Sequence, residues 1–344
     1  MTHRFPIKEI ARQAGLGTAT VDRVLNNRSH VSPQTRNRVA AALRELEAQE
    51  AQLVAKGRRI ILDVLAESPK RFSREIRLAA ESAVGSIPSA AIRLRFQFQE
   101  VMTEAETIAA LNRIANRGSH GLCLKARDTP AVRDAIGRLA AARIPVFTLV
   151  TDLPLTARQG YFGLNNAQAG RTAAYLMAQS LPALKGTVLM SRSQDSFRGE
   201  TDRYTAFCDL ITTLRPGVRL MDVSGGAGVT ATTAQRLQSV LATGASVTAV
   251  YSMGGGNAAI LRVLAAHGQT PAVFVAHDLD RENRHLLAVG AIQYVLHHDL
   301  EKDMRTLLGA ALGGFKSMPA VRNVASSAVQ IITPFNLSDL SGGV

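Results

Sequence analysis

The sequence predicts an α/β protein in which an N-terminal all-α helix-turn-helix headpiece is followed by two doubly wound parallel-sheet lobes. Helical patterns fill the first 46 residues, and from residue 60 apolar strand-like runs alternate with helical ones at nearly constant spacing. The chain has 344 residues, 46% of them hydrophobic, which is enough for more than one buried core. We expect two lobes because about ten strands are too many for one ordinary open sheet.

Three short helices are expected in the headpiece. The first covers 7–14, where apolar side chains recur at helical spacing, and Gly15 follows where a chain leaving a helix favours a left-handed residue. The second covers 18–26. The third begins at Ser32 and Pro33, because serine caps a helix and proline suits its first turn.

Three of these positions satisfy the geometry of a helix-turn-helix. Ala11 is small where the helices approach, Gly15 makes the turn, and Val21 is an apolar wedge between the helices. Residues 1–59 also carry eleven Lys and Arg against five Asp and Glu, whereas the remaining 285 residues carry 29 against 22. A solvated basic surface would explain the charge alone, but the combination predicts binding to DNA.

The string IKEIARQAGLGTATVDRVLNNRSHVSPQTRNRV resembles the DNA-binding headpiece of the lactose/galactose repressor (LacI/GalR) family, whose pattern reads I-x-D-V-A-x-x-A-G-V-S-x-x-T-V-S-R-V-L-N and then V-S-x-x-T-R-x-R-V. The resemblance implies two groups of DNA contacts. Base edges in the major groove would be read by Thr18, Ala19 and Arg23. Phosphates would be contacted by Thr20, Asn26, Ser32 and Thr35. Capping or packing is the alternative role for several of these side chains.

Two positions depart from the family pattern. Gly17 replaces the serine before the recognition helix, and Asp22 replaces the serine before Arg23. We expect Asp22 to pair with Arg23 or Arg12, or to accept a hydrogen bond from a cytosine amine. The operator sequence of better-known members therefore does not transfer to this protein.

Residues 1–46 form the expected headpiece, and residues 47–59 form a linker. By resemblance, this linker is a hinge that folds on the operator and inserts a leucine into the minor groove, with Leu53 as the candidate and Val54 as the alternative. The usual Tyr-x-Pro-Asn entry is missing, and the helix formers at 47–51 could simply extend the third helix.

The body is expected over 60–337, followed by a tail at 338–344. Strands are expected at 60–66, 92–98, 121–126, 145–151, 186–191, 247–252, 272–277, 291–297 and 328–333, and helices at 104–117, 129–142, 166–181, 199–214, 230–243, 256–267 and 299–314. The first lobe would cover about 60–160 and 299–325, and the second about 161–298 and 326–337.

Polar residues gather at the carboxyl ends of the expected strands, where ligands of such sheets bind. They are Asp152, Arg203, Asn257, Asp278, His298 and Asp299. Carboxylates accept hydrogen bonds from vicinal hydroxyls, and Arg and Asn donate them, so the set suits a hydroxyl-rich ligand. Each residue alone could equally be a cap or a turn.

The body is similar to the effector domain of the same family and to type I periplasmic sugar-binding proteins. YFGLNNAQAGRTAAYLM resembles V-G-x-D-N-x-x-A-G, and DRYTAF resembles R-x-x-G-F, which implies that Arg203 is the ligand arginine. VAHDLD corresponds to G-x-D-D and supplies Asp278, and LHHD places His298 in a glutamine position. The resemblance also implies an aromatic platform at Phe72, with Phe197 as a second one.

Two features widen the expected range of effectors. MGGGN replaces the usual Asn-Asp before Asn257, and a glycine-rich helix start could present N–H groups to an anion, so a sugar phosphate is included. His298, and His277 beside Asp278, suggest a pH-sensitive or differently shaped site, although ordinary hydrogen bonding also explains them.

No enzyme, cofactor or metal is expected. G-x-G-x-x-G, G-K-[ST] and G-x-S-x-G motifs are missing, the histidines and acids near the C-terminus lack metal-ligand spacing, and Cys123 and Cys208 suit buried thiols. The start of the chain lacks the apolar stretch of a secretory signal, and no membrane span is visible, which predicts a cytoplasmic protein.

The sequence thus predicts a transcriptional regulator, a repressor by resemblance, whose affinity for double-stranded operator DNA is controlled by a sugar, polyol or sugar phosphate. A homodimer on a pseudo-palindromic operator is expected because one short helix recognises a half-site too weakly, and the lack of a C-terminal heptad repeat favours dimers over tetramers. The alternative is a DNA-architectural protein that responds to no effector.

Overall fold

The computed structural model describes residues 5–26, 28, 31–55, 59–87, 91–181, 186–313 and 326–337, without the side chains of 48–55 and 59. The chain divides into two compact units, one formed by residues 1–60 with 87–93 and the other by residues 61–86 with 94–344. Within the described residues, no helix is long and apolar enough to cross a membrane.

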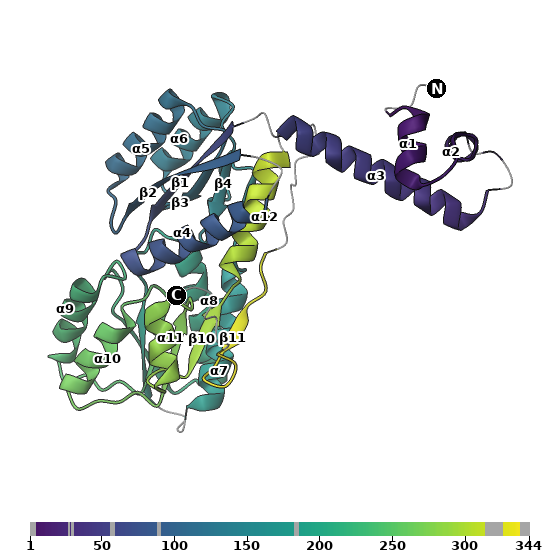
Figure 1. The fold of residues 1–344 in the computed structure, drawn as a ribbon. Helices are drawn as coiled ribbons and strands as arrows, with labels where there is room; N and C mark the ends of the chain where they lie inside the picture. The colour runs from purple at the N-terminus through teal and green to yellow at the C-terminus, as the bar shows by residue number, and fades with distance from the viewer. Residues whose placement is uncertain are drawn as a thin grey trace. The chain divides into compact units, whose positions relative to one another are not determined.

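The first unit contains the three helices that the sequence predicts, α1 (Ile7–Ala14), α2 (Thr18–Leu25) and α3 (Pro33–Ala55) (Figure 1). Their apolar faces close one small core made of Phe5, Ile10, Ala11, Ala14, Val21, Val39, Ala42 and Leu46. Gly15 ends α1 with φ 61°, the left-handed conformation that glycine tolerates best. The Arg38 guanidinium donates to the carbonyls of Ala14 and Gly15 at 2.9 and 3.2 Å, so α3 caps the end of α1.

Helix α3 starts and continues as its sequence suggests. The Ser32 hydroxyl accepts a hydrogen bond from the Thr35 backbone amide at 3.2 Å, which makes Ser32 the cap. The helix then runs without interruption to Ala55. Residues 47–55 therefore extend the third helix, which was one of the two alternatives for the linker.

The first lobe of the second unit is a five-stranded sheet in the order β2-β1-β3-β4-β5. Its strands are β1 (Arg59–Glu67), β2 (Ala91–Gln99), β3 (Leu122–Lys125), β4 (Val146–Leu149) and β5 (Gly160–Phe162). Helices α5 (Glu104–Arg117) and α6 (Pro130–Ala141) share one apolar core with the sheet. Helices α4 (Lys70–Gly85) and α12 (Leu300–Gly313) pack against each other, and α12 side chains meet those of β1 and β3.

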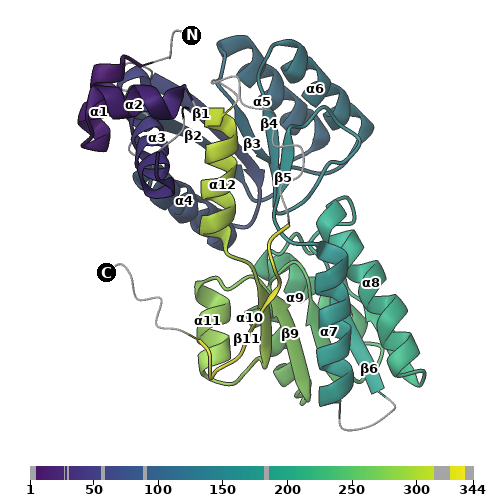
Figure 2. The same cartoon turned by 90° about the vertical axis from the view of Figure 1, so that its right-hand side faces the viewer.

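The second lobe is a six-stranded sheet in the order β11-β10-β9-β8-β6-β7. Its strands are β6 (Gly186–Ser191), β7 (Val218–Asp222), β8 (Ala249–Ser252), β9 (Val273–His277), β10 (Tyr294–His297) and β11 (Gln330–Ile332). One core includes side chains from α7 (Asn166–Ser180) and α8 (Arg198–Leu214). The other includes those of α9 (Thr230–Leu241), α10 (Asn257–Ala266) and α11 (Arg281–Ala288), which confirms the doubly wound arrangement (Figure 2).

Several elements differ from the sequence-based expectation. Strands β5 and β7 were not expected, because β5 has only three residues and β7 is a partly exposed edge strand. Helices α4 and α11 were also missed. Strand β11 pairs antiparallel with β10. Because β5 pairs with β4, the first sheet continues beyond residue 160, where the sequence-based boundary between the lobes was placed.

The chain passes between the lobes along neighbouring segments. Leu164 after β5 forms a parallel bridge with Ser327 before β11, and the Ser327 amide donates to the Gly163 carbonyl at 2.9 Å. The third passage follows β10 at His298 and enters α12. Helix α12 thus returns to the first lobe, and β11 comes back to the second.

Candidate functional site

The carboxyl ends of strands from both lobes meet at one small cavity of about 40 Å³. The two walls of this small cavity therefore lie close together. Six charged side chains line the cavity: Arg71, Lys125, Glu200, Arg203, Asp278 and Asp280. Three of these side chains are basic and three are acidic. The cavity therefore has no excess of positive or negative side chains.

Four of the predicted effector residues reach this cavity, namely Phe72, Phe197, Arg203 and Asp278. Arg203 on α8 is buried, its Nε donates to the Asn166 Oδ1 at 2.7 Å, and its Nη1 donates to the Met253 carbonyl at 3.2 Å. Gly170 on α7 permits this, because a Cβ atom there would overlap the backbone of Arg203. Close packing of α7 on α8 therefore fixes the arginine.

Asp278 combines a strained backbone conformation with an unpartnered carboxylate oxygen. It follows β9 with φ 65°, a conformation that strains a non-glycine residue. The backbone is held there because its amide donates to the Leu296 carbonyl at 3.0 Å and its carbonyl accepts from the Asn283 side chain at 2.7 Å. Its Oδ1 is buried without a hydrogen-bond partner. A ligand hydroxyl would satisfy this acceptor.

Three of the predicted residues do not line the cavity: Asp152, Asn257 and His298. The Asp152 carboxylate accepts from the Thr148 hydroxyl at 2.9 Å and from the Leu153 amide at 2.8 Å, and it pairs with Arg158. Asn257, the first residue of α10, is buried and donates to the Asn283 Oδ1 at 2.6 Å. Both side chains are turned toward neighbouring loops and helices, and the effector role of Asp152 and Asn257 stays a prediction.

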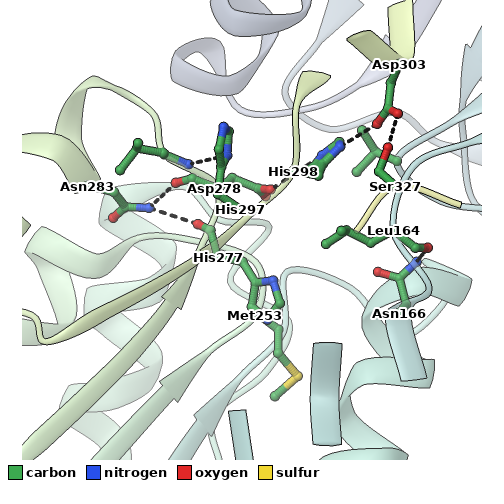
Figure 3. A network of polar contacts seen from close by, with 12 residues as sticks. Leu164, Asn166, Met253, His277, Asp278, Asn283, His297, His298, Asp303 and Ser327 are labelled. Atoms are coloured by element: carbon green, nitrogen blue, oxygen red, sulfur yellow. Dashed lines mark hydrogen bonds and ion pairs between the residues drawn. The ribbon is translucent and has the colours of Figure 1, made fainter. Parts of the chain in front are cut away.

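His298 lies behind Asp278 rather than in the cavity (Figure 3). It is buried, its Nδ1 is 2.6 Å from the Asp303 Oδ2 on α12, and its Nε2 is 3.9 Å from the Asp278 Oδ1. Asp303 also accepts a hydrogen bond from the Ser327 hydroxyl. The imidazole thus joins the cavity wall to the passages between the lobes.

Burial disfavours the protonated form of the two other histidines near this point. Burial holds the pKa of His277 well below its usual value, and its Nε2 lies 2.9 Å from the Tyr251 hydroxyl. Burial also lowers the pKa of His297 to about 4, and its Nδ1 accepts a hydrogen bond from the Leu279 amide. Neither ring supplies the pH sensitivity near neutrality that His277 suggested.

Sequence reasoning missed the charged residues that complete the cavity. The Lys125 Nζ donates to the Glu67 carbonyl at 2.7 Å and lies 3.8 Å from the centre of the Phe197 ring. Burial lowers the pKa of Lys125, while the nearby Glu200 and Glu67 oppose this effect. A charged lysine near the end of the apolar strand GLCLKA is the sequence feature that indicates a side chain at the ligand-binding edge of the sheet. Arg71 and Asp280 pair across the cavity at 3.0 Å.

The described residues offer little for redox or metal chemistry. Cys123 is buried, and burial raises the pKa of its thiol to about 12, whereas Cys208 is only half-buried. Within the described ranges, no group of three His, Cys, Asp or Glu side chains could hold a metal ion.

In the helical unit, α2 presents Thr18, Ala19 and Arg23 to solvent, and Thr20 is half-buried. Asn26 ends the helix, and its amide donates to the Asp22 Oδ1 at 2.8 Å. Asp22 also pairs with Arg28 at 3.6 Å, so its partners are not the predicted Arg23 or Arg12.

The remaining predicted phosphate contacts lie at the start of α3. The hydroxyls of Ser32 and Thr35 are 2.9 Å apart, with Ser32 exposed and Thr35 half-buried. The side chain of Leu53, the predicted wedge, lies outside the described residues. The helical unit also exposes several basic side chains: Lys8, Arg12, Arg28, Arg36 and Arg44.

Comparison with known proteins identifies both parts of the chain. Residues 6–47 match the family described as "Bacterial regulatory proteins, lacI family", and residues 71–302 match "Periplasmic binding protein domain". The HTH-type transcriptional regulator TreR of Salmonella typhimurium is 53% identical over 45 residues, which cover 13% of this chain and 14% of that protein. The matched segment is therefore a small part of this relative.

Two solved structures share the fold of the body. GanP, a glucose-galactose binding protein from Geobacillus stearothermophilus, is 17% identical with a TM-score of 0.71, covering 81% of this chain and 99% of that one. An ABC transporter solute binding protein from Burkholderia graminis in complex with D-arabinose is 16% identical with a TM-score of 0.71, covering 83% and 97%.

Proposed function

The chain belongs to the periplasmic binding protein family and joins this domain to a DNA-binding domain of the lacI family of bacterial regulatory proteins, and from this we propose that it is an effector-controlled transcriptional repressor. The TreR relative is likewise named as a regulator. The proposed domains are the headpiece at 1–46, the linker at 47–59 and the effector domain at 60–337. A family of regulatory proteins agrees with the expectation that the chain is not an enzyme.

The observation that carries the proposal is the pairing of two surfaces in one chain. One is the solvent-facing row of Thr18, Ala19 and Arg23 on a short helix among basic side chains. The other is the cavity lined by the donor Arg203 and by Asp278, whose Oδ1 has no hydrogen-bond partner. A regulator needs a surface that reads DNA and a site that senses a small molecule.

The effector in this proposal is a sugar, polyol or sugar phosphate. An unpartnered carboxylate oxygen, a fixed guanidinium and the Phe72 ring suit a ring compound with several hydroxyls. The related folds whose names include glucose, galactose and arabinose support this choice. Ligand contact with both walls would change the equilibrium between lobe arrangements and thereby operator affinity.

The regulator acts as a homodimer in this proposal, with two headpieces on a pseudo-palindromic operator. The test is selection of bound fragments from sheared genomic DNA by the full chain at near-physiological salt, with and without pooled sugars and polyols. We expect one palindromic site whose occupancy changes with one pool. Recovery of fragments without sequence preference, unchanged by every pool, would contradict the proposal and favour an architectural protein.

A further inference from the structure

Arg71 crosses the cavity between the two lobes. It lies in the first turn of α4 in the first lobe, yet its partners belong to the second lobe. Its Nε is 3.0 Å from the Asp280 Oδ2, and its Nη2 donates to the Gly254 carbonyl at 3.3 Å. The side chains of Arg71 and Asp280 are 22% and 3% exposed, so the ion pair is largely shielded from water. A shielded pair between lobes is strong enough to affect how they close.

The glycine run before α10 is shaped around this guanidinium. A Cβ atom at Gly255 would overlap the Arg71 guanidinium, whereas one at Gly254 would meet Ser193 and one at Gly256 would meet Thr233. A Cβ atom at each glycine would thus meet a different neighbour, and the positive φ of Gly255 (87°) and Gly256 (81°) also favours glycine. The group that lies against the middle one is cationic, which differs from the anion that the glycine-rich helix start suggested.

Arg71 also fills space that an effector needs. With its guanidinium in place, the cavity volume is about 40 Å³. Its guanidinium lies against the Asp280 carboxylate. An effector that binds Asp280 must therefore displace Arg71.

We propose that Asp280, the Gly254 carbonyl and the bare backbone of Gly255 form a guanidinium-binding subsite, and that Arg71 is its tethered occupant, which holds the lobes together until an effector displaces it. The displacement step rests on the proposed function, whereas the subsite does not. The displacing ligand must offer Asp280 hydrogen-bond donors of its own, such as vicinal hydroxyls.

Because Arg71 is covalently attached to the chain, it occupies the subsite at Asp280 in preference to free cations. A group linked by a short flexible segment reaches an effective concentration of about millimolar or more at its site. Free guanidinium compounds at micromolar concentration should therefore not compete with it. When the tethered group is removed, the same subsite should become open to a free compound of the same chemistry.

The experiment uses the full chain, the variant Arg71→Ala and N-ethylguanidinium, which restores the atoms that the substitution removes beyond Cβ. We expect calorimetry to show binding of this compound to Arg71→Ala at millimolar concentration and no binding to the wild type. Small-angle scattering should show a larger radius of gyration for Arg71→Ala that returns toward the wild-type value with the compound. Arg74→Ala, which changes an exposed arginine on the same helix, should behave as the wild type.

Two further variants keep the test decisive. Arg71→Gln retains most of the side-chain length, so the same expansion is expected if Arg71→Ala folds poorly. Asp280→Asn in the Arg71→Ala background should abolish binding of N-ethylguanidinium. Unchanged scattering together with no binding to either Arg71 variant would overturn the proposal. Because these measurements need neither operator nor effector, their failure is distinguishable from failure of the proposed function.

Discussion

The His298 Nδ1 lies 2.6 Å from the Asp303 Oδ2, and this contact joins the end of β10 in the second lobe to α12 in the first. Both residues are buried. Asp303→Ala would leave the imidazole nitrogen without its acceptor, so we expect the free energy of unfolding to fall by about 1–3 kcal/mol.

Urea unfolding followed by circular dichroism measures this loss. The matched control is Glu301→Ala on the same helix, since Glu301 and its partner Arg305 are both about half exposed and such pairs contribute about 0.3–0.5 kcal/mol. Equal losses in the two variants would show that the His298 contact contributes no more than a surface pair.

Gly170→Ala should destabilise the second lobe. The added methyl group would overlap the backbone of Arg203, so α7 and α8 must move apart at a loss of about 1–3 kcal/mol. Gly309→Ala on α12 is the control, because a Cβ atom there meets nothing and alanine favours a helix by up to about 1 kcal/mol. In thermal unfolding, we expect Gly170→Ala to melt below the wild type and Gly309→Ala above it. An unchanged melting temperature of Gly170→Ala would contradict the packing described above.

Asp280 predicts a pH dependence of stability. Burial raises its pKa to about 6 in the folded chain, against 3.8 ordinarily, although Arg71 opposes the rise and Asp278 and Glu282 add to it. Between these two values the folded state holds a proton that the unfolded state has lost. As pH falls from 7 to 4, the wild type should therefore gain up to about 3 kcal/mol relative to Asp280→Asn. Urea unfolding of both proteins across this range measures the difference, and parallel pH profiles would rule out the raised pKa.

Arg23→Ala should weaken binding to the selected operator by about 1–3 kcal/mol and leave binding to a scrambled duplex nearly unchanged. The reason is that Arg23 faces solvent on α2, where the family resemblance places base contacts. Fluorescence anisotropy with both duplexes measures the two affinities, with Arg44→Ala on α3 as the control. Equal losses on both duplexes would make Arg23 a phosphate contact instead.

Asp278→Ala should abolish the response to the active sugar pool while operator binding without the pool persists. Asp278 lines the cavity, and its buried Oδ1 has no hydrogen-bond partner. Asp152→Ala is the informative comparison, because the Asp152 carboxylate is held by Arg158 and does not line the cavity. Fluorescence anisotropy of the operator with and without the sugar pool measures the response of each variant, and we expect Asp152→Ala to retain it. A full response in Asp278→Ala would move the effector site elsewhere.

The elements that the sequence predicted are those with long apolar runs, such as β6 and β9, where every residue of β9 is buried. Strand β5 was missed because three residues carry no periodic signal, and β7 because an edge strand has a weak one. For the cavity, Arg203 and Asp278 were found because the topology of a parallel sheet brings its carboxyl ends together.

The remaining site residues depend on features that spacing does not encode. Asp152 also follows a strand, but Arg158 six positions later turns its carboxylate away. Arg71 acts through a partner more than two hundred residues away on the other lobe. Such a pair is set by how the two lobes meet, which no local pattern reveals.

The return of α12 to the first lobe and of β11 to the second has a consequence for protein engineering. Neither lobe is a single continuous stretch of polypeptide, so a truncation after β10 would strip a helix from one sheet and an edge strand from the other. The lobes of this protein can therefore not be exchanged as single continuous segments. A chimera needs several junctions, placed where the chain passes from one lobe to the other.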